Sequence, residues 1–186
     1  NKELPDPVIS EEEREKALET VAEKLRANFR LKTQELLGDK SQKEIEHILI
    51  IASMLEKEAR EFEDMQKIAG IIEERLKRGM KIEIDATVGY DWCLRLSLAN
   101  NFSKDCKASE APIALELRKD SPYNTYRIQG LPPAPISNPG IKSIAAALHP
   151  AKTPYLYYLS PRDGSRVIYS KTGGEHSANR RKYLGI

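Results

Sequence analysis

An apolar helical stretch interrupted by one acid is the part of the chain best suited to chemistry. Residues 47–58 read HILIIASMLEKE. On a helix turning about 100° per residue, Leu49, Ala52 and Glu56 fall on nearly one line, whereas Glu58 lies on a different face and is given no role. A carboxylate among aliphatic side chains loses solvation, so the pKa of Glu56 is expected to rise toward the range of a general acid. A buried structural Glu paired with Arg or Lys is the alternative, and the helix alone favours it.

A second candidate region is the proline-rich stretch 121–140, SPYNTYRIQGLPPAPISNPG. Its prolines exclude a long regular element and favour a stiff, shaped surface. Aromatic rings can cover the apolar faces of sugars, while amides and hydroxyls meet sugar hydroxyls. The stretch therefore suits sugar recognition, and a purely structural loop is the open alternative. The candidate side chains are Tyr123, Asn124, Thr125, Tyr126 and Asn138.

Other reactive side chains give weaker signals. Glu175 and His176 follow a predicted strand, and His176 is a candidate to orient a substrate. Cys93 and Cys106 lie in one polar segment without zinc-site spacing, and both a disulfide and two free thiols remain open. Nothing suggests a metal or a cofactor. The chain also has no phosphate-binding glycine loop and no Gly-x-Ser-x-Gly elbow, so nucleotide chemistry and serine hydrolysis are poor candidates.

Composition indicates an ordinary water-soluble domain. The 186 residues are 40% hydrophobic and 31% charged, with a net charge of +2, which gives no reason to propose nucleic acid as a partner. No apolar run is long enough to cross a bilayer, and the first residues do not resemble a signal peptide. The sequence also lacks a starting Met, so we expect a piece of a longer protein, and any membrane anchor or targeting signal could lie outside it.

The helices that must position these residues occupy the first 80 positions. Ser10 with Glu13 is a capping box that opens a long amphipathic helix ending at Gly38, whose apolar stripe we expect to pack. Ser41 with Glu44 opens the helix that carries Glu56. After a break near residues 62–64, a third helix buries the isoleucines of residues 68–72 and ends at Gly79.

After Gly79 the pattern changes. Residues 81–85 alternate apolar and polar side chains, which predicts a strand with Ile82 and Ile84 facing inward. Residues 111–119 are helix or strand, and residues 141–150 form a short helix. Residues 153–160 and 165–171 form a hairpin around a PRDG turn, followed by a terminal helix with a basic cluster. The pattern predicts an α+β fold: a helical N-terminal half packed on a small, mainly antiparallel sheet, with a catalytic cleft between them.

From about residue 45 onward the sequence resembles the endolytic murein transglycosylases, also called YceG-like proteins. The segments that carry the resemblance are ASMLEKEA (52–59), IAGIIEERLKRGMKIEIDATVGY (68–90), the stretch 121–140, AALHPAKTPYLYYLS (146–160) and, more weakly, YSKTGGEHSANRRKYL (169–184). Residues 41–186 are thus expected to form the catalytic domain, after an N-terminal amphipathic segment, residues 1–40. Two features depart from the family's pattern. Asp85-Ala86-Thr87-Val88 replaces the family's Asp-Pro-Thr-Val, and the insert with both cysteines differs from the short connection expected there.

The resemblance implies a bacterial enzyme that cleaves the MurNAc-β-1,4-GlcNAc bond within peptidoglycan strands. The family's catalytic acid corresponds to Glu56, the first Glu of the Glu-Lys-Glu triplet. It would protonate the glycosidic oxygen and then act as the base toward the MurNAc C6 hydroxyl, leaving a 1,6-anhydro ring. A single-pass anchor in the inner membrane, outside this sequence, would hold the catalytic region facing the periplasm or cell wall, and cell-wall synthases are a further candidate partner.

The residues around the acid receive subsidiary roles. Asp85 and Thr87 are expected to position Glu56 or the sugar, and residues 123–126 to line the groove with Asn138 and His176. Asp85 and Glu175 are candidates for a second carboxylate if the reaction is instead hydrolysis, which would give reducing ends. A non-catalytic peptidoglycan-binding scaffold is the alternative from another class, because it needs the sugar-binding loop but no proton donor.

Overall fold

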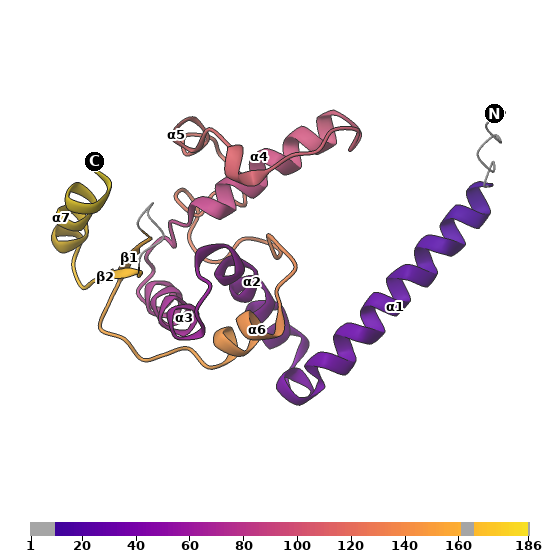
Figure 1. The fold of residues 1–186 in the computed structure, drawn as a ribbon, viewed down its shortest axis with the longest axis horizontal. Coiled ribbons are helices and arrows are strands. Elements are labelled where there is room, and N and C mark those ends of the chain that lie inside the picture. The colour runs from indigo at the N-terminus through magenta and orange to yellow at the C-terminus, as the bar shows by residue number, and fades with distance from the viewer. Residues whose placement is uncertain (1–9, 161–165, 186) are drawn as a thin grey trace, which may run out of the picture. The chain divides into compact units, whose positions relative to one another are not determined.

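The computed structural model describes residues 10–160 and 166–185 (Figure 1). The chain forms two compact units, Asn1–Asp39 and Lys40–Ile186. In the first unit, helix α1 (Glu11–Leu37) begins with the predicted capping box between Ser10 and Glu13 and ends at Gly38. Among residues 10–39, the described part of this unit, α1 is the only helix, and no second element covers its apolar stripe. Leu18 and Leu25 are accordingly 63% and 64% exposed, against the expectation that the stripe packs.

The core of the second unit is formed by three helices that lie side by side (Figure 1). They are α2 (Gln42–Glu58), α3 (Phe62–Lys77) and α6 (Ile141–Leu148). The Ser41–Glu44 capping box that opens α2 is confirmed, and the predicted break falls at residues 59–61. The apolar side chains that meet between the helices are fully buried: Ile51, Met54, Leu55, Ile68, Ile71, Ile72 and Ile144.

The segment after Gly79 is not the predicted strand. Gly79, at φ +65°, ends α3, and residues 80–84 then run in irregular conformation into helix α4 (Asp85–Ala99). Ile82 and Ile84 are buried as the alternation predicted. Their neighbour, however, is a loop rather than a strand: Glu83 N donates to Thr125 O at 3.2 Å. The alternating pattern therefore identified the buried face, and the missing partner strand made the strand prediction wrong.

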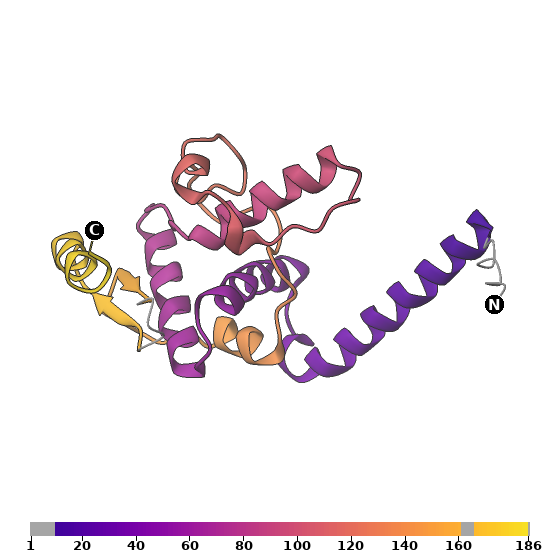
Figure 2. The ribbon, with the colours of Figure 1, turned by 45° about the horizontal axis from the view of Figure 1, so that its top comes forward.

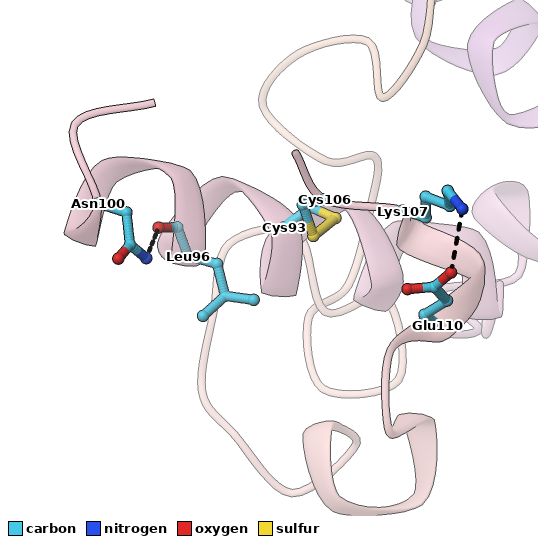
Figure 3. The surroundings of a disulfide bond; sticks show 6 residues. All are labelled: Cys93, Leu96, Asn100, Cys106, Lys107 and Glu110. Atoms are coloured by element: carbon cyan, nitrogen blue, oxygen red, sulfur yellow. Dashed lines mark hydrogen bonds and ion pairs between the residues drawn. A yellow bond between two sulfur atoms is a disulfide. The ribbon is translucent and has the colours of Figure 1, made fainter. Parts of the chain in front are cut away.

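Helix α4 is tied to the following segment by a disulfide between Cys93 and Cys106, which answers the question that the sequence left open (Figure 3). The chain continues through a short 3-10 helix, η1 (Ala108–Glu110), and helix α5 (Ile113–Glu116). Both elements pack against α4. Helical structure thus continues well beyond the first 80 residues.

The sheet has two short antiparallel strands, β1 (Tyr157–Leu159) and β2 (Ile168–Ser170), with Tyr158 opposite Tyr169. The predicted hairpin is confirmed, while its PRDG turn, residues 161–164, lies outside the described residues. Helix α7 (Gly173–Leu184) packs on the hairpin (Figure 2). The fold is α+β, as predicted. In the described ranges, 10–160 and 166–185, no helix combines the length and the apolar character needed to span a membrane.

Candidate active site

A cavity of about 790 Å³ lies in the second unit, where the end of α2 meets the first turns of α4. None of the residues that line this cavity belongs to β1 or β2, so the predicted cleft between the helices and the sheet stays a prediction. One wall is the disulfide and the segment after it. The lining residues are Lys57, Glu58, Asp85, Ala86, Tyr90, Cys93, Cys106, Lys107, Ala108, Ser109, Ile113 and Ile136.

Glu58 is the desolvated acid of this cavity. Burial raises the pKa of its carboxyl to about 7, and the negative charge of Asp85 acts in the same direction. A 2.8 Å hydrogen bond donated by the Tyr158 hydroxyl to Glu58 Oε2 opposes part of that rise. Burial raises the pKa of Tyr158 itself well above its usual value, so this hydroxyl keeps its proton and acts as donor. Glu58 thus has the properties of a general acid near neutral pH.

Glu56, the residue singled out from the sequence, is exposed, so the predicted burial among aliphatic side chains is wrong. Its Oε2 accepts hydrogen bonds from Gly140 N at 3.1 Å and Ser143 Oγ at 2.8 Å. Both donors belong to the first turn of α6 or its cap, where a carboxylate also meets the positive end of the helix dipole. Glu56 therefore joins the end of α2 to the start of α6.

Two of the predicted site residues, Asp85 and Tyr126, do lie near Glu58. Asp85, the first residue of α4, lines the cavity. Its Oδ1 accepts a 2.6 Å hydrogen bond from the Tyr126 hydroxyl. Burial raises the pKa of Tyr126 above its usual range, and the Asp85 bond adds to that rise, so Tyr126 donates.

Three predicted residues instead build the scaffold behind the cavity. Thr87, Asn124 and Thr125 are almost fully buried. Thr125 Oγ1 accepts from Ile84 N at 3.0 Å and shares a 2.9 Å hydrogen bond with the Thr87 hydroxyl. The Asn124 amide donates to three backbone carbonyls, those of Glu116, Leu117 and Lys119. These side chains hold the 124–126 segment against the start of α4, and none of them lines the cavity.

The remaining predicted residues lie elsewhere. The Tyr123 ring packs on that of Tyr90, a cavity residue, with centroids 5.0 Å apart. Asn138 is exposed and does not line the cavity. His176 lies on α7, where it stacks on Tyr157, and burial lowers its pKa. The structure therefore does not bring His176 or Asn138 into the cavity with Glu58.

Comparison with known proteins shows which family the chain belongs to. The chain belongs to the YceG-like family, whose model matches residues 8–182. It is 39% identical over 145 residues to the endolytic murein transglycosylase of Bacillus subtilis, covering 78% of this chain and 36% of that protein. It is 30% identical over 135 residues to the endolytic murein transglycosylase of Streptococcus pneumoniae, covering 73% of this chain and 23% of that protein.

A solved structure shows the same fold. The crystal structure of a putative YceG-like protein from Listeria monocytogenes, at 2.6 Å resolution, superposes with a TM-score of 0.59 at 35% identity. The match covers 82% of this chain and 43% of that one. The chain spans about a third or less of the length of the curated relatives.

Proposed function

We propose that this chain is the catalytic region of an endolytic lytic transglycosylase and that Glu58 is its acid. The substrate is the MurNAc-β-1,4-GlcNAc bond within peptidoglycan strands, and the product carries a 1,6-anhydro-MurNAc end. The observation that carries the proposal is the Glu58 carboxyl, with a pKa raised to about 7 by burial, at a cavity large enough for sugar units. The two similar proteins named endolytic murein transglycosylases support it.

One carboxyl group serves two steps in this mechanism. Protonated Glu58 donates its proton to the glycosidic oxygen as the bond to C1 breaks through an oxocarbenium-like state. The resulting carboxylate then accepts the proton of the MurNAc C6 hydroxyl, whose oxygen forms the new bond to C1. A pKa of about 7 suits both roles, since neither the acid nor the base form is rare near neutral pH. The proton taken up in the second step restores the starting form of Glu58.

The setting of the reaction is part of the proposal. We place the cavity facing the cell wall, on a protein held to the inner membrane by a segment outside this sequence, with cell-wall synthases as candidate partners. Cross-linking in living cells, followed by identification of the captured proteins, tests the partners. Recovery of the full-length protein in a washed membrane fraction tests the anchor.

The decisive experiment is mass spectrometry of purified glycan strands after incubation with the chain and two matched variants, Glu58→Gln and Glu56→Gln. Both variants remove one carboxylate from the same turn of α2. We expect anhydro ends from the unmodified chain, none from Glu58→Gln, and residual product from Glu56→Gln. A normal yield from Glu58→Gln with loss only in Glu56→Gln would transfer the acid role to Glu56.

Two other product patterns decide between classes of function. Reducing ends in place of anhydro ends would mean hydrolysis, in which water rather than the C6 hydroxyl attacks C1. Strands that bind without being cut would support the scaffold function. Because the curated relatives are much longer, a longer form of the protein is tested alongside before inactivity is assigned.

A further inference from the structure

The proposed function assigns a role to only one of the two carboxyl groups that line the cavity. Glu58 comes from the last turn of α2, and Asp85 is the first residue of α4. Both line the same cavity, and the negative charge of Asp85 adds to the rise that burial gives the pKa of Glu58. Like charges placed together in this way disfavour simultaneous ionisation, so one partner is expected to hold the proton.

Hydrogen bonds to two tyrosines distinguish the two carboxyl groups. Tyr158 donates to Glu58 and Tyr126 donates to Asp85. The Tyr126 bond to Asp85 is the shorter, at 2.6 Å against 2.8 Å. Glu58 is half-buried, whereas Asp85 is exposed to the cavity and to solvent. Burial thus favours the protonated form of Glu58, while Asp85 lies open to the cavity with the Tyr126 hydroxyl bound to it.

The backbone around Asp85 is fixed by the same segment that supplies Tyr126. Thr125 O accepts from Glu83 N, and Thr125 Oγ1 accepts from Ile84 N. Tyr126 N in turn donates to Asn124 Oδ1 at 3.1 Å. The positions of Asp85 and of its hydroxyl donor are thus set by one buried network. A charge placed in advance in this way stabilises a developing opposite charge without reorganising during the reaction.

We propose that Asp85, held by the Tyr126 hydroxyl, is a second functional carboxylate that stabilises the positive charge developing on the sugar as the glycosidic bond breaks. This inference rests on the proposed transglycosylase function. Asp85 forms no covalent bond to the sugar and transfers no proton, so the product is still the 1,6-anhydro ring. Tyr126 acts as a positioning residue through Asp85.

Steady-state kinetics on purified glycan strands test the proposal with three variants. Asp85→Asn removes the charge, Tyr126→Phe removes only the hydroxyl that holds Asp85, and Glu46→Gln removes an exposed carboxylate of α2 away from the cavity. Glu46 accepts a 3.0 Å hydrogen bond from the Gln42 side chain and does not line the cavity, so it is the control. We expect Asp85→Asn to lower kcat on the order of 100-fold with KM changed less than about twofold. Tyr126→Phe should lower kcat roughly tenfold, and Glu46→Gln should leave it unchanged.

A second readout separates this role from a structural one. Asp85 also lies at the N-terminus of α4, where an acid stabilises the helix. Carbon-13 NMR titration of the Glu58 carboxyl is expected to give a lower pKa in Asp85→Asn than in the unmodified chain, and an unchanged one in Glu46→Gln. The other ionisable groups near this pair are Tyr158 on β1, Tyr126 and Glu83, with Arg75 on α3 acting on Tyr158. The cavity lining adds Lys57, Tyr90 and Lys107. All of these groups are kept in Asp85→Asn.

The outcomes are distinguishable from failure of the proposed function. Absence of anhydro product from the unmodified chain and from its longer form overturns the transglycosylase function, and the Asp85 role with it. Normal product from the unmodified chain together with a kcat for Asp85→Asn within about twofold overturns the role of Asp85 alone. A loss of kcat that parallels a loss of folded protein, with the pKa of Glu58 unmoved, assigns Asp85 to helix stability and also overturns the proposal.

Discussion

The Tyr158 hydroxyl donates a 2.8 Å hydrogen bond to Glu58 Oε2, although 100 positions separate the two residues in the chain. The bond joins strand β1 to the last turn of α2. It connects the small sheet to a cavity that the sheet itself does not line. The sheet therefore contributes to the site by setting the protonation and position of the proposed acid.

Removing this donor should make Glu58 a weaker acid. In Tyr158→Phe the ring still shields the carboxyl, but the hydrogen bond that lowers its pKa is lost, so the pKa should rise above about 7. The measurement is the carbon-13 titration of Glu58, with the pH dependence of turnover beside it. Tyr169→Phe is the matched control, because Tyr169 lies opposite on β2 and donates to Asp64 instead. An unchanged titration in Tyr158→Phe would contradict the assignment of this bond.

Glu58 should also make stability fall with rising pH. Its folded pKa of about 7 lies above the ordinary value of 4.5, so the folded state holds a proton that the unfolded state releases. The stabilisation is complete below about pH 4.5 and is lost as pH rises through 7, by on the order of 3 kcal/mol. Denaturant unfolding at pH 5 and pH 8 gives the free energy of unfolding of Glu58→Gln and of the unmodified chain. The difference between the two should shift in favour of Glu58→Gln at pH 8. Glu56→Gln should show no comparable gain, and equal behaviour of the two variants would refute the prediction.

Sequence patterns predicted the helices of the core well because their signals are local. The capping boxes at Ser10 and Ser41 and the stop at Gly79 depend on residues within one turn of each other, and all three are confirmed. The strand at residues 81–85 failed because alternation reports which side chains are buried, whereas a strand also requires a partner. Its inward-facing isoleucines were nevertheless identified correctly.

The predicted burial of Glu56 failed for a related reason. Every residue of α2 from Ile50 to Leu55 is buried, so the middle of this helix is covered all round and a single stripe does not define its buried side. Whether Glu56 or Glu58 is desolvated is decided by contacts from distant segments, α6 for Glu56 and β1 for Glu58. No periodicity within α2 contains that information. The sugar-binding interpretation of residues 124–125 missed their burial because polar side chains that satisfy backbone groups look like ligand-binding ones in sequence.

Asn124 should be important for stability rather than for direct contact with substrate. Its amide donates to three carbonyls, and its Oδ1 accepts from Tyr126 N. Asn124→Ala leaves these buried groups unpaired and should lower the free energy of unfolding by about 2–4 kcal/mol. Asn124→Asp keeps the acceptor and loses the donors, so it should also destabilise the chain. Urea denaturation measures both, and a loss of activity in Asn124→Ala without any loss of stability would contradict this role.

The disulfide should stabilise the wall of the cavity. Cys93 and Cys106 close a short loop, and opening it should lower the free energy of unfolding by about 3 kcal/mol. Unfolding of the unmodified chain with and without a dithiol reductant measures the effect. The Cys93→Ser, Cys106→Ser double variant is the control, and the reductant should not change its free energy of unfolding. Equal stability of the oxidised chain and the double variant would show that the bond contributes nothing.

Gly70 marks a close contact between α3 and the segment after α6. A Cβ at this position would lie 2.0 Å from Ala151 O, which is a backbone atom and not the end of a flexible side chain. Gly70→Ala should therefore lower the free energy of unfolding by more than about 2 kcal/mol despite the better helix propensity of Ala. Gly174→Ala is the control, since Gly174 lies on α7 with its nearest neighbouring atom 3.9 Å from the added Cβ. Thermal unfolding of the two variants decides the prediction, and equal melting temperatures would refute it.

The bond between Cys93 and Cys106 also closes off an exposed tip from the wall of the cavity. Residues 101–105 are exposed, and they lie within the ring that the bond closes. Changes in the length or composition of that tip are absorbed inside the ring, because both of its ends are fixed at the cavity wall. The tip is therefore a natural insertion point. An affinity tag, a fluorophore or a second binding module could be grafted there while the spacing between Cys106 and Glu58 is preserved.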